Sequence, residues 1–263
     1  MSADVGDATG ARGRRIALAI GLAVAVLWEL SVRAGVMSGR FLPPPTETLA
    51  ALYRGIQSGE MVASVAITVR RVFSGLLLGA SIGLVAGWLI GASRRLSAVT
   101  DPMIAALHPI PKLALLPLFM MLLGLGETAR VAVIAAAAFF PMVVNSMAGV
   151  RHINPLHFDV ARSYGANRWD LLGLVILPGS APMVLTGLRL SANVAFLSTT
   201  AVEMVAANDG LGALIWLSWQ VLRPELLFAT LFVIAVLGVT LNVALRWVAR
   251  RAAPWLGERA SAV

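Results

Sequence analysis

HFDVARSYGANRWD, the stretch from His157 to Asp170, gathers two acids, two arginines, a glycine and an asparagine past the middle of an apolar chain. The runs on either side, Val131–Val144 and Leu171–Leu177, are almost wholly apolar. Only 13% of the 263 residues are charged, so this concentration of charge marks a segment with a task of its own.

The beginning of the stretch predicts a short amphipathic helix. Asn154 is a favourable N-cap residue, and Pro155 fits the first helical position because the N–H that it lacks is not needed there. Gly165 can end the helix in a left-handed conformation. The apolar positions recur every four residues as one stripe, at Leu156, Val160 and Tyr164. The helix therefore has two distinct faces.

A second short helix is expected after the glycine. Asn167 can cap it, Asp170 completes a partial capping box, and Pro178 is expected to end it. A simple connection would not need a helix with distinct faces, so we expect one face to rest on a membrane domain and the other to meet a soluble partner. The alternative is a helix lying flat on lipid, but the stripe is narrow and lacks bulky anchors.

The composition indicates an integral membrane protein. Hydrophobic residues make up 59% of the chain, and the charged fraction is about half that of a soluble domain. The net charge of +8 does not indicate nucleic-acid binding, because the basic residues stand mostly at the ends of apolar runs. There is no cysteine, and the three histidines lack metal-site spacing, so we expect no metal site.

Six apolar runs are each near the roughly 20 residues that a helix needs to cross the hydrocarbon core. They are continuous and do not alternate, which argues against strands. The sequence therefore predicts an all-α integral membrane protein with six transmembrane helices, and the polar loop falls between helices 4 and 5. The predicted spans are about Ile16–Val32, Val62–Ala92, Pro102–Leu123, Ala129–Gly149, Ala181–Met204 and Leu226–Val248.

Three regions follow from these spans. Residues 1–60 are expected to hold an N-terminal cytoplasmic tail, the first helix and an outer loop. Residues 61–250 form a five-helix core with the polar loop at 151–180, and residues 251–263 form a cytoplasmic C-terminal tail.

Arginines set the expected direction of the spans, because cytoplasmic segments carry an excess of Lys and Arg. With the N-terminus inside, twelve arginines fall in inner segments (Arg12, Arg14, Arg15, Arg94, Arg95, Arg151, Arg162, Arg168, Arg246, Arg250, Arg251 and Arg259) and five in outer ones (Arg33, Arg40, Arg54, Arg130 and Arg223). Both termini are then cytoplasmic. The first run resembles a cleavable signal peptide, but Glu29 and the lack of a clean cleavage site favour an uncleaved helix.

The second run is too long for one simple crossing. Arg70 and Arg71 are expected near the outer surface, where their stems can reach the headgroups. Five glycines then recur every four residues, at Gly75, Gly79, Gly83, Gly87 and Gly91. Such a ladder lets helix backbones approach closely in lipid, either within one subunit or between two subunits.

The third run is irregular. Its sequence HPIPKLALLPL places Pro109, Pro111 and Pro117 beside Lys112, and proline kinks a helix. Broken backbone at membrane depth is tolerated where it is buried in protein or lines a wet cavity. Lys112 therefore either lines a pathway or reaches water at the cytoplasmic interface.

The polar loop resembles the EAA loop of permease subunits of type I ABC importers. That pattern is E-A-A, a few residues, G, about nine mostly apolar residues and L-P. Asp159, Val160 and Ala161 stand at the E-A-A positions, Gly165 at the glycine, and Leu177–Pro178 at the L-P. Asp159 keeps the charge on a shorter arm, and Val160 adds bulk.

Other segments, over about residues 40–250, are similar to the branch of this family that imports sulfonates, taurine, nitrate and related oxyanions. They are FLPPP, HPIPKLALLPLFMMLLGLGE, FFPMVVNSMAGV, GLRLS, AVEMVAANDGLG and the arginine-rich end. The resemblance implies a permease that moves such a solute from a binding protein into the cytoplasm. Other small solutes, such as a vitamin precursor, bicarbonate or an amino acid, stay open.

The resemblance also implies the partners: a second permease copy, two cytoplasmic ATPase subunits and an external solute-binding protein, assembled in the bacterial inner membrane. The chain has no G-x-x-x-x-G-K-[ST] loop, so ATP and Mg²⁺ would bind the ATPase, and this chain would hold no cofactor and be no enzyme. The helix in the polar loop would dock into the ATPase as a coupling helix, through Leu156, Asp159, Val160, Ala161, Arg162, Ser163 and Gly165.

Three charged residues are candidates for the translocation pathway: Lys112, Arg189 and Glu203. The two cations would favour an anion, or they anchor at the interfaces, and Glu203 either lines the pathway or bonds across helices. The rival function is an ion-coupled secondary transporter, which predicts inverted repeats and paired acids at mid-membrane. No convincing repeat is found, and no nucleophile–base or metal constellation supports a membrane-embedded enzyme.

Overall fold

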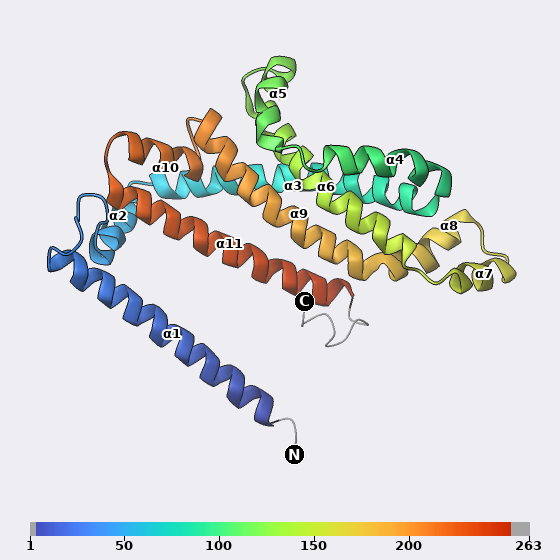
Figure 1. Ribbon diagram of the computed structural model, residues 1–263, viewed down its shortest axis with the longest axis horizontal. Coiled ribbons are helices and arrows are strands. Elements are labelled where there is room, and N and C mark those ends of the chain that lie inside the picture. Colours follow the sequence, from blue (N-terminus) through green and yellow to red (C-terminus); the bar gives the residue numbers. More distant parts are fainter. Residues whose placement is uncertain (1–3, 254–263) are drawn as a thin grey trace. The chain divides into compact units, whose positions relative to one another are not determined.

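The computed structural model describes residues 4–253, and within these residues it contains helices and no strand (Figure 1). This confirms the all-α prediction. Two compact units are present, Met1–Ala63 with Leu214–Val233, and Ser64–Ala213 with Ile234–Val263. The predicted regions 1–60 and 61–250 stay predictions, and most of the predicted tail 251–263, including Arg259, lies outside the described residues.

The described elements follow one another along the chain as short and long helices. In order they are α1 (Asp4–Arg33), α2 (Pro45–Gln57), α3 (Glu60–Ala92), α4 (Arg94–Leu107), the 3₁₀ turn η1 (Lys112–Leu115), α5 (Leu116–Leu123), α6 (Glu127–Arg151), α7 (Pro155–Ser163), α8 (Arg168–Leu171), the π turn η2 (Leu172–Ile176), α9 (Leu177–Ala206), α10 (Leu211–Gln220) and α11 (Pro224–Ala252).

Four stretches of the described chain are helices long and apolar enough to cross a membrane: α3, α6, Arg168–Ala206 and α11. Four of the predicted spans lie inside them. A fifth is reached if α4 and Lys112–Leu123 count as one broken span, and α1 contains the first predicted span. The count of six transmembrane helices is therefore not confirmed.

The predicted third span, Pro102–Leu123, is not one helix. α4 begins earlier, at Arg94, and the chain bends by 91° between its end at Leu107 and η1. Pro109 and Pro111 lie in this break, where each removes an N–H donor and restricts the residue before it. The prolines therefore divide the run instead of only kinking it.

The expected end of the second loop helix at Pro178 is also wrong. α8, η2 and α9 form one helical stretch of 39 residues, from Arg168 to Ala206. A π turn at Leu172–Ile176 stands immediately before the proline, which occupies the first turn of α9. The wider turn changes the hydrogen-bond pattern at the point where proline offers no N–H, so the helix continues through it.

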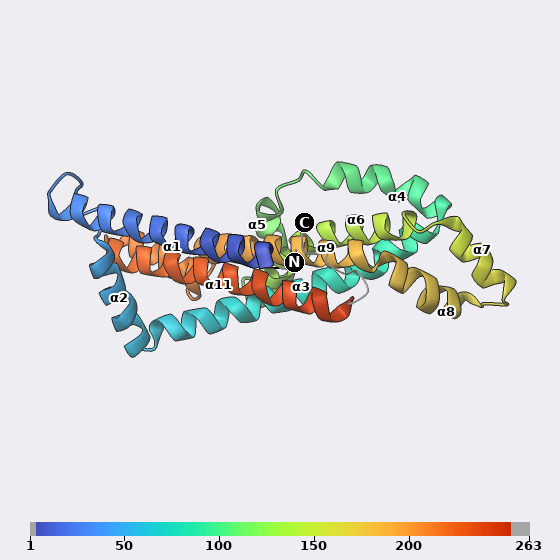
Figure 2. The same ribbon diagram turned by 90° about the horizontal axis from the view of Figure 1, so that it is seen from below.

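The core of the larger unit lies where α3, α6 and α9 run alongside one another, as both views show (Figures 1 and 2). Its buried cluster comprises Leu76, Ala80, Ile134, Ala138, Met142, Ala192 and Ala195. Large apolar side chains point away from this core, among them Leu77 and Leu197, which are 73% and 69% exposed. Apolar residues on the outside and small residues inside are typical of helices surrounded by lipid.

In the smaller unit, Glu29 of α1 caps the beginning of α2. Its carboxylate accepts hydrogen bonds from the backbone N–H of Thr46, at 3.1 Å, and from the Thr46 hydroxyl, at 2.9 Å. Arg33 donates to the same carboxylate at 2.6 Å. The positive end of the α2 dipole and this arginine together hold a negative charge that the sequence alone placed in a membrane span.

Candidate coupling loop and buried charges

The loop between α6 and α9 folds as its residue types predict. The Asn154 side chain accepts a hydrogen bond from the Leu156 N–H at 2.9 Å and so caps α7. Pro155 begins the helix, and Gly165 follows its end with a φ of +80°, which favours glycine. Local capping chemistry therefore fixes both ends of this nine-residue helix.

The second half of the loop is held by a capping box. Asn167 Oδ1 accepts from the Trp169 and Asp170 N–H groups, at 2.8 and 3.1 Å. The Asp170 carboxylate accepts from the Asn167 N–H at 2.9 Å in return. The box that was expected to be partial is complete, and it begins the long helical stretch that leads into α9.

α7 has no buried residue, and its apolar stripe is open. Leu156 is 60% exposed, Val160 48% and Tyr164 89%. In Figures 1 and 2, α7 lies beyond the ends of α6 and α9. A helix that exposes its apolar face, and that its own chain does not cover, offers that face to something else.

The charged face of α7 carries little internal bonding. Arg162 and Asp159 approach to 3.6 Å, with both side chains more than 60% exposed, and the Ser163 hydroxyl donates to the Asp159 carbonyl at 2.9 Å. These are local contacts of the helix with itself. Six of the seven predicted coupling residues lie on α7, and Gly165 lies two residues after its end.

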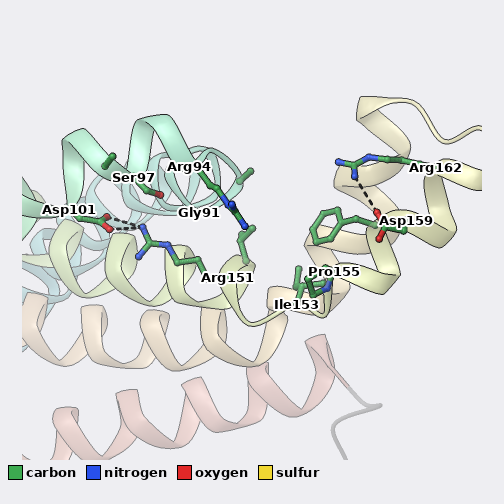
Figure 3. A pocket seen from close by; sticks show the side chains of 13 residues that line it. Gly91, Arg94, Ser97, Asp101, Arg151, Ile153, Pro155, Asp159 and Arg162 are labelled. Carbon is green, nitrogen blue, oxygen red and sulfur yellow. Dashed lines mark hydrogen bonds and ion pairs between the residues drawn. The ribbon is translucent and has the colours of Figure 1, made fainter.

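A cavity of about 680 Å³ lies between α7 and the ends of α3, α4 and α6 (Figure 3). Asp101 and Arg151 close one side of it as an ion pair at 2.8 Å, while Asp159 and Arg162 line the α7 side. Figure 3 shows Arg94 near Gly91, on the α4 side of the cavity. The opening means that α7 is connected to the helices mainly through its flanking chain.

The glycine ladder of α3 faces α6 of the same chain. A Cβ at Gly79 would lie 2.1 Å from the carbonyl oxygen of Ala135, and one at Gly87 would lie 2.6 Å from that of Val143. Added Cβ atoms at the other three would also come closer than 3.0 Å to α6 atoms, at Gly75, Gly83 and Gly91. The ladder makes close backbone contacts within one chain.

Lys112 provides hydrogen bonds to backbone carbonyl groups at the break between α4 and η1. Its ammonium donates to the backbone carbonyl oxygens of Leu107, His108 and Ile110 at 2.9, 2.7 and 2.8 Å. The same nitrogen lies 4.1 Å from the centre of the Phe140 ring. Lys112 and Phe140 also line a cavity of about 430 Å³ that α6 and α9 complete.

Glu203, near the end of α9, is fully buried. Its carboxylate accepts hydrogen bonds from the Thr68 hydroxyl and the Gly212 N–H, each at 2.9 Å, and from Arg71 at 3.0 Å. Arg189 lies on the same helix, partly exposed. Neither Glu203 nor Arg189 lines the cavity beside Lys112, so the structure does not bring the three pathway candidates together.

The expectation that Arg71 reaches the headgroups is wrong. Its side chain is 0% exposed and contacts three carboxylates, those of Glu127, Glu203 and Asp209. Arg70 remains 64% exposed, 3.6 Å from Glu127. An unpaired charge in a span is costly, so the sequence indicated that Arg71 needs an acidic partner, but it did not indicate which acid.

The chain is similar to known transport proteins over most of its length. The family model described as "Binding-protein-dependent transport system inner membrane component" matches residues 79–256. The taurine transport system permease protein TauC of Escherichia coli (strain K12) is 32% identical over an alignment of 252 residues that covers 93% of this chain and 92% of the relative. A putative aliphatic sulfonates transport permease protein, SsuC of Bacillus subtilis (strain 168), is 32% identical over 232 residues, 88% of this chain and 84% of the relative.

A solved structure shares the fold. A chain of the MetNI methionine ABC transporter, in an inward-facing conformation, matches with a TM-score of 0.67 and 17% sequence identity. The match covers 74% of this chain and 97% of that chain.

Proposed function

Because the chain belongs to the family of binding-protein-dependent transport system inner membrane components, we propose that it carries a small oxyanion from an external binding protein into the cytoplasm. As a member of this family it is an integral membrane permease subunit of an ABC importer and not an enzyme. ATP hydrolysis takes place on a separate subunit, which would also hold the Mg²⁺.

The exposed stripe of α7 is the observation that carries the coupling role. Leu156, Val160 and Tyr164 lie on one face of a helix whose two ends are capped and whose length is fixed. A capped helix with an open apolar face fits a groove on a second protein. The ATPase is the partner that an importer needs on the cytoplasmic side, and α7 is its docking element.

The chain from α7 to α9 can transmit force. α8, η2 and α9 form one helical stretch, and α9 alone has 30 residues, a length of about 45 Å. When ATP binding moves the docked α7, the helix that follows moves with it as a rigid body. The permease opens outward, the solute enters, and hydrolysis reopens the inner side.

The solute is a small oxyanion of the sulfonate, taurine or nitrate kind. Two of the relatives are a taurine permease and a putative aliphatic sulfonates permease, which supports this class. The cavity beside Lys112, at about 430 Å³, has the size of a small-molecule site, and a lysine at its wall favours an anion. Lys112 is the pathway candidate that the geometry favours over Arg189 and Glu203.

The assembly contains two copies of this chain, two ATPase subunits and one external binding protein, in the bacterial inner membrane with both chain termini cytoplasmic. The family description, a binding-protein-dependent inner membrane component, supports this arrangement. The excess of arginine in the inner segments supports the direction.

Two variants of one helix test the coupling role. Val160→Glu places a charge in the exposed stripe, whereas Val160→Ile keeps the same position apolar. We expect Val160→Glu to abolish co-purification of the ATPase and ATP-driven uptake, and Val160→Ile to keep both. Uptake that persists at full rate with the ATPase removed would exclude an ATP-driven importer.

A further inference from the structure

Arg71 uses every hydrogen-bond donor of its guanidinium. Nε and one terminal nitrogen donate to the two oxygens of Glu127, the former at 2.9 Å. The other terminal nitrogen, Nη1, donates to Glu203 at 3.0 Å and to the Asp209 carbonyl at 2.8 Å, while Nη2, which binds Glu127, also donates to the Asp209 carboxylate at 2.5 Å. Five donors in a rigid fork are a property of arginine that lysine does not have.

Two of these five bonds hold a loop and not a helix. Asp209 belongs to the short connection between α9 and α10 and is bound through both its backbone carbonyl and its carboxylate. Arg71 comes from α3, Glu127 from α6 and Glu203 from α9. The arginine therefore attaches the α9–α10 connection to all three helices of the core.

The rest of the connection is held in the same way. The Thr68 hydroxyl accepts from the Leu211 N–H at 2.9 Å, and Arg130 donates to the Ala206 carbonyl at 2.9 Å. Gly210 has a φ of +97°, and a Cβ there would lie 2.4 Å from the Glu203 carboxylate. The backbone is thus fixed on both sides of Asn208, which is itself exposed.

The loop lies at the end of α9 that is opposite to α7. A 30-residue helix of about 45 Å is longer than the roughly 30 Å hydrocarbon core, so its two ends emerge on opposite sides of a membrane. If α7 binds the ATPase on the cytoplasmic side, the connection Ala207–Gly210 lies on the external side of the membrane. A loop ordered before binding loses less entropy when a partner docks.

We infer that Arg71 is a positioning residue that fixes Ala207–Gly210 as a docking element for the external solute-binding protein. The binding protein contacts the exposed Asn208 and the half-exposed Asp209 in the loop conformation that the Arg71 hydrogen bonds stabilise. This inference rests on the proposed function, since it requires a binding protein as partner. Arg71 itself, being fully buried, touches neither the partner nor the solute.

A matched pair of substitutions tests the inference in the complete transporter reconstituted in nanodiscs. Arg71→Lys keeps a positive charge beside Glu203 but cannot make the five bonds, and Arg70→Lys makes the same exchange at an exposed neighbour. The readouts are ATPase activity against binding-protein concentration and the mobility of a spin label at Asn208→Cys. The chain has no cysteine of its own, so Asn208→Cys is the one labelling site in each copy of it.

For Arg71→Lys we expect a more mobile label and a half-saturating binding-protein concentration about tenfold higher, with basal ATPase activity within about twofold. Arg70→Lys should leave both readouts unchanged. A label of unchanged mobility, or a mobile label with unchanged half-saturation, overturns the inference. A general loss of structure would instead lower basal activity and assembly together.

Asp209→Ala decides the matter if Arg71→Lys does not assemble. It removes the loop's carboxylate and leaves the Arg71 contacts with Glu127 and Glu203 in place. The same rise in label mobility and half-saturation is expected, and their absence overturns the inference. If the unsubstituted chain neither co-purifies with an ATPase nor responds to a binding protein, the proposed function has failed instead.

Discussion

Gly79 of α3 and Ala135 of α6 bring two membrane helices into backbone contact. A Cβ at Gly79 would lie 2.1 Å from the Ala135 carbonyl oxygen and 3.0 Å from its Cα. Contacts this short leave no room for any side chain, and backbone cannot move aside as the end of a flexible side chain can. The close separation of α3 and α6 therefore depends on the lack of a Cβ atom at Gly79.

Gly79→Ala should push these helices apart. Overpacking of this kind costs about 1–3 kcal/mol, which for a chain of this size lowers the thermal midpoint by roughly 5 °C. The measurement is thermal unfolding in detergent. Gly238→Ala in α11 is the control, because its nearest neighbour, Phe196 Cε1, lies 3.5 Å away. Equal midpoints for the two variants would contradict the packing argument.

Gly165→Val should weaken coupling without affecting the membrane core. The residue has a φ of +80°, and nothing lies within 4 Å of an added Cβ, so the penalty is conformational and not steric. It amounts to about 1–2 kcal/mol for most residues, and a β-branched side chain tolerates it least. ATP-driven uptake in vesicles should fall strongly.

Gly165→Asn is the matched control for that variant. Asparagine adopts the left-handed conformation more readily than valine and should keep more of the uptake. Loss of uptake to the same degree in both variants would show that conformation at Gly165 is not what matters.

Lys112→Met should destabilise the break between α4 and η1. Three carbonyl oxygens lose their common donor, and because the site is partly exposed, water replaces part of what is lost. We expect a cost of about 1 kcal/mol, or a midpoint roughly 2–4 °C lower. Lys112→Arg, which keeps the charge, should also retain uptake of the anion. A midpoint that does not change in Lys112→Met would contradict this role.

Asp159→Ala should leave stability nearly unchanged. Its ion pair with Arg162 is long, at 3.6 Å, and exposed on both sides, and such pairs contribute about 0.3–0.5 kcal/mol. A double-mutant cycle with Arg162→Ala, measured by thermal unfolding, should give a coupling energy within that range. A larger value would mean that the pair shapes α7 itself.

Local chemistry made the fold of the loop between α6 and α9 predictable. Asn154, Pro155, Gly165 and Asn167 each act on the backbone next to them, so their roles can be deduced from neighbouring residues alone. The all-α membrane class followed from composition in the same direct way. The prediction that the helix ends at Pro178 was wrong because a π turn precedes the proline and lets the helix continue, and no sequence pattern indicated this turn.

Long-range partners were not predictable from one sequence. Arg71 lies 132 positions from Glu203 and 138 from Asp209, and nothing in the local pattern joins them. The sequence analysis placed Arg71 at the membrane surface because an arginine in a span without an acidic partner is expected to extend its side chain to the aqueous interface. Only the packing of α3 against α6 and α9 supplies those acids.

The π turn at Leu172–Ile176 amounts to a one-residue insertion at the base of α9. Since each helical residue turns the chain by about 100°, deleting Gly173 would let the turn close to ordinary α-helix and rotate Arg168–Leu171 by about that angle relative to α9. One additional residue therefore sets the rotation of the α7–α8 loop about the axis of α9, and its deletion should turn that loop to a different side while α9 itself stays intact.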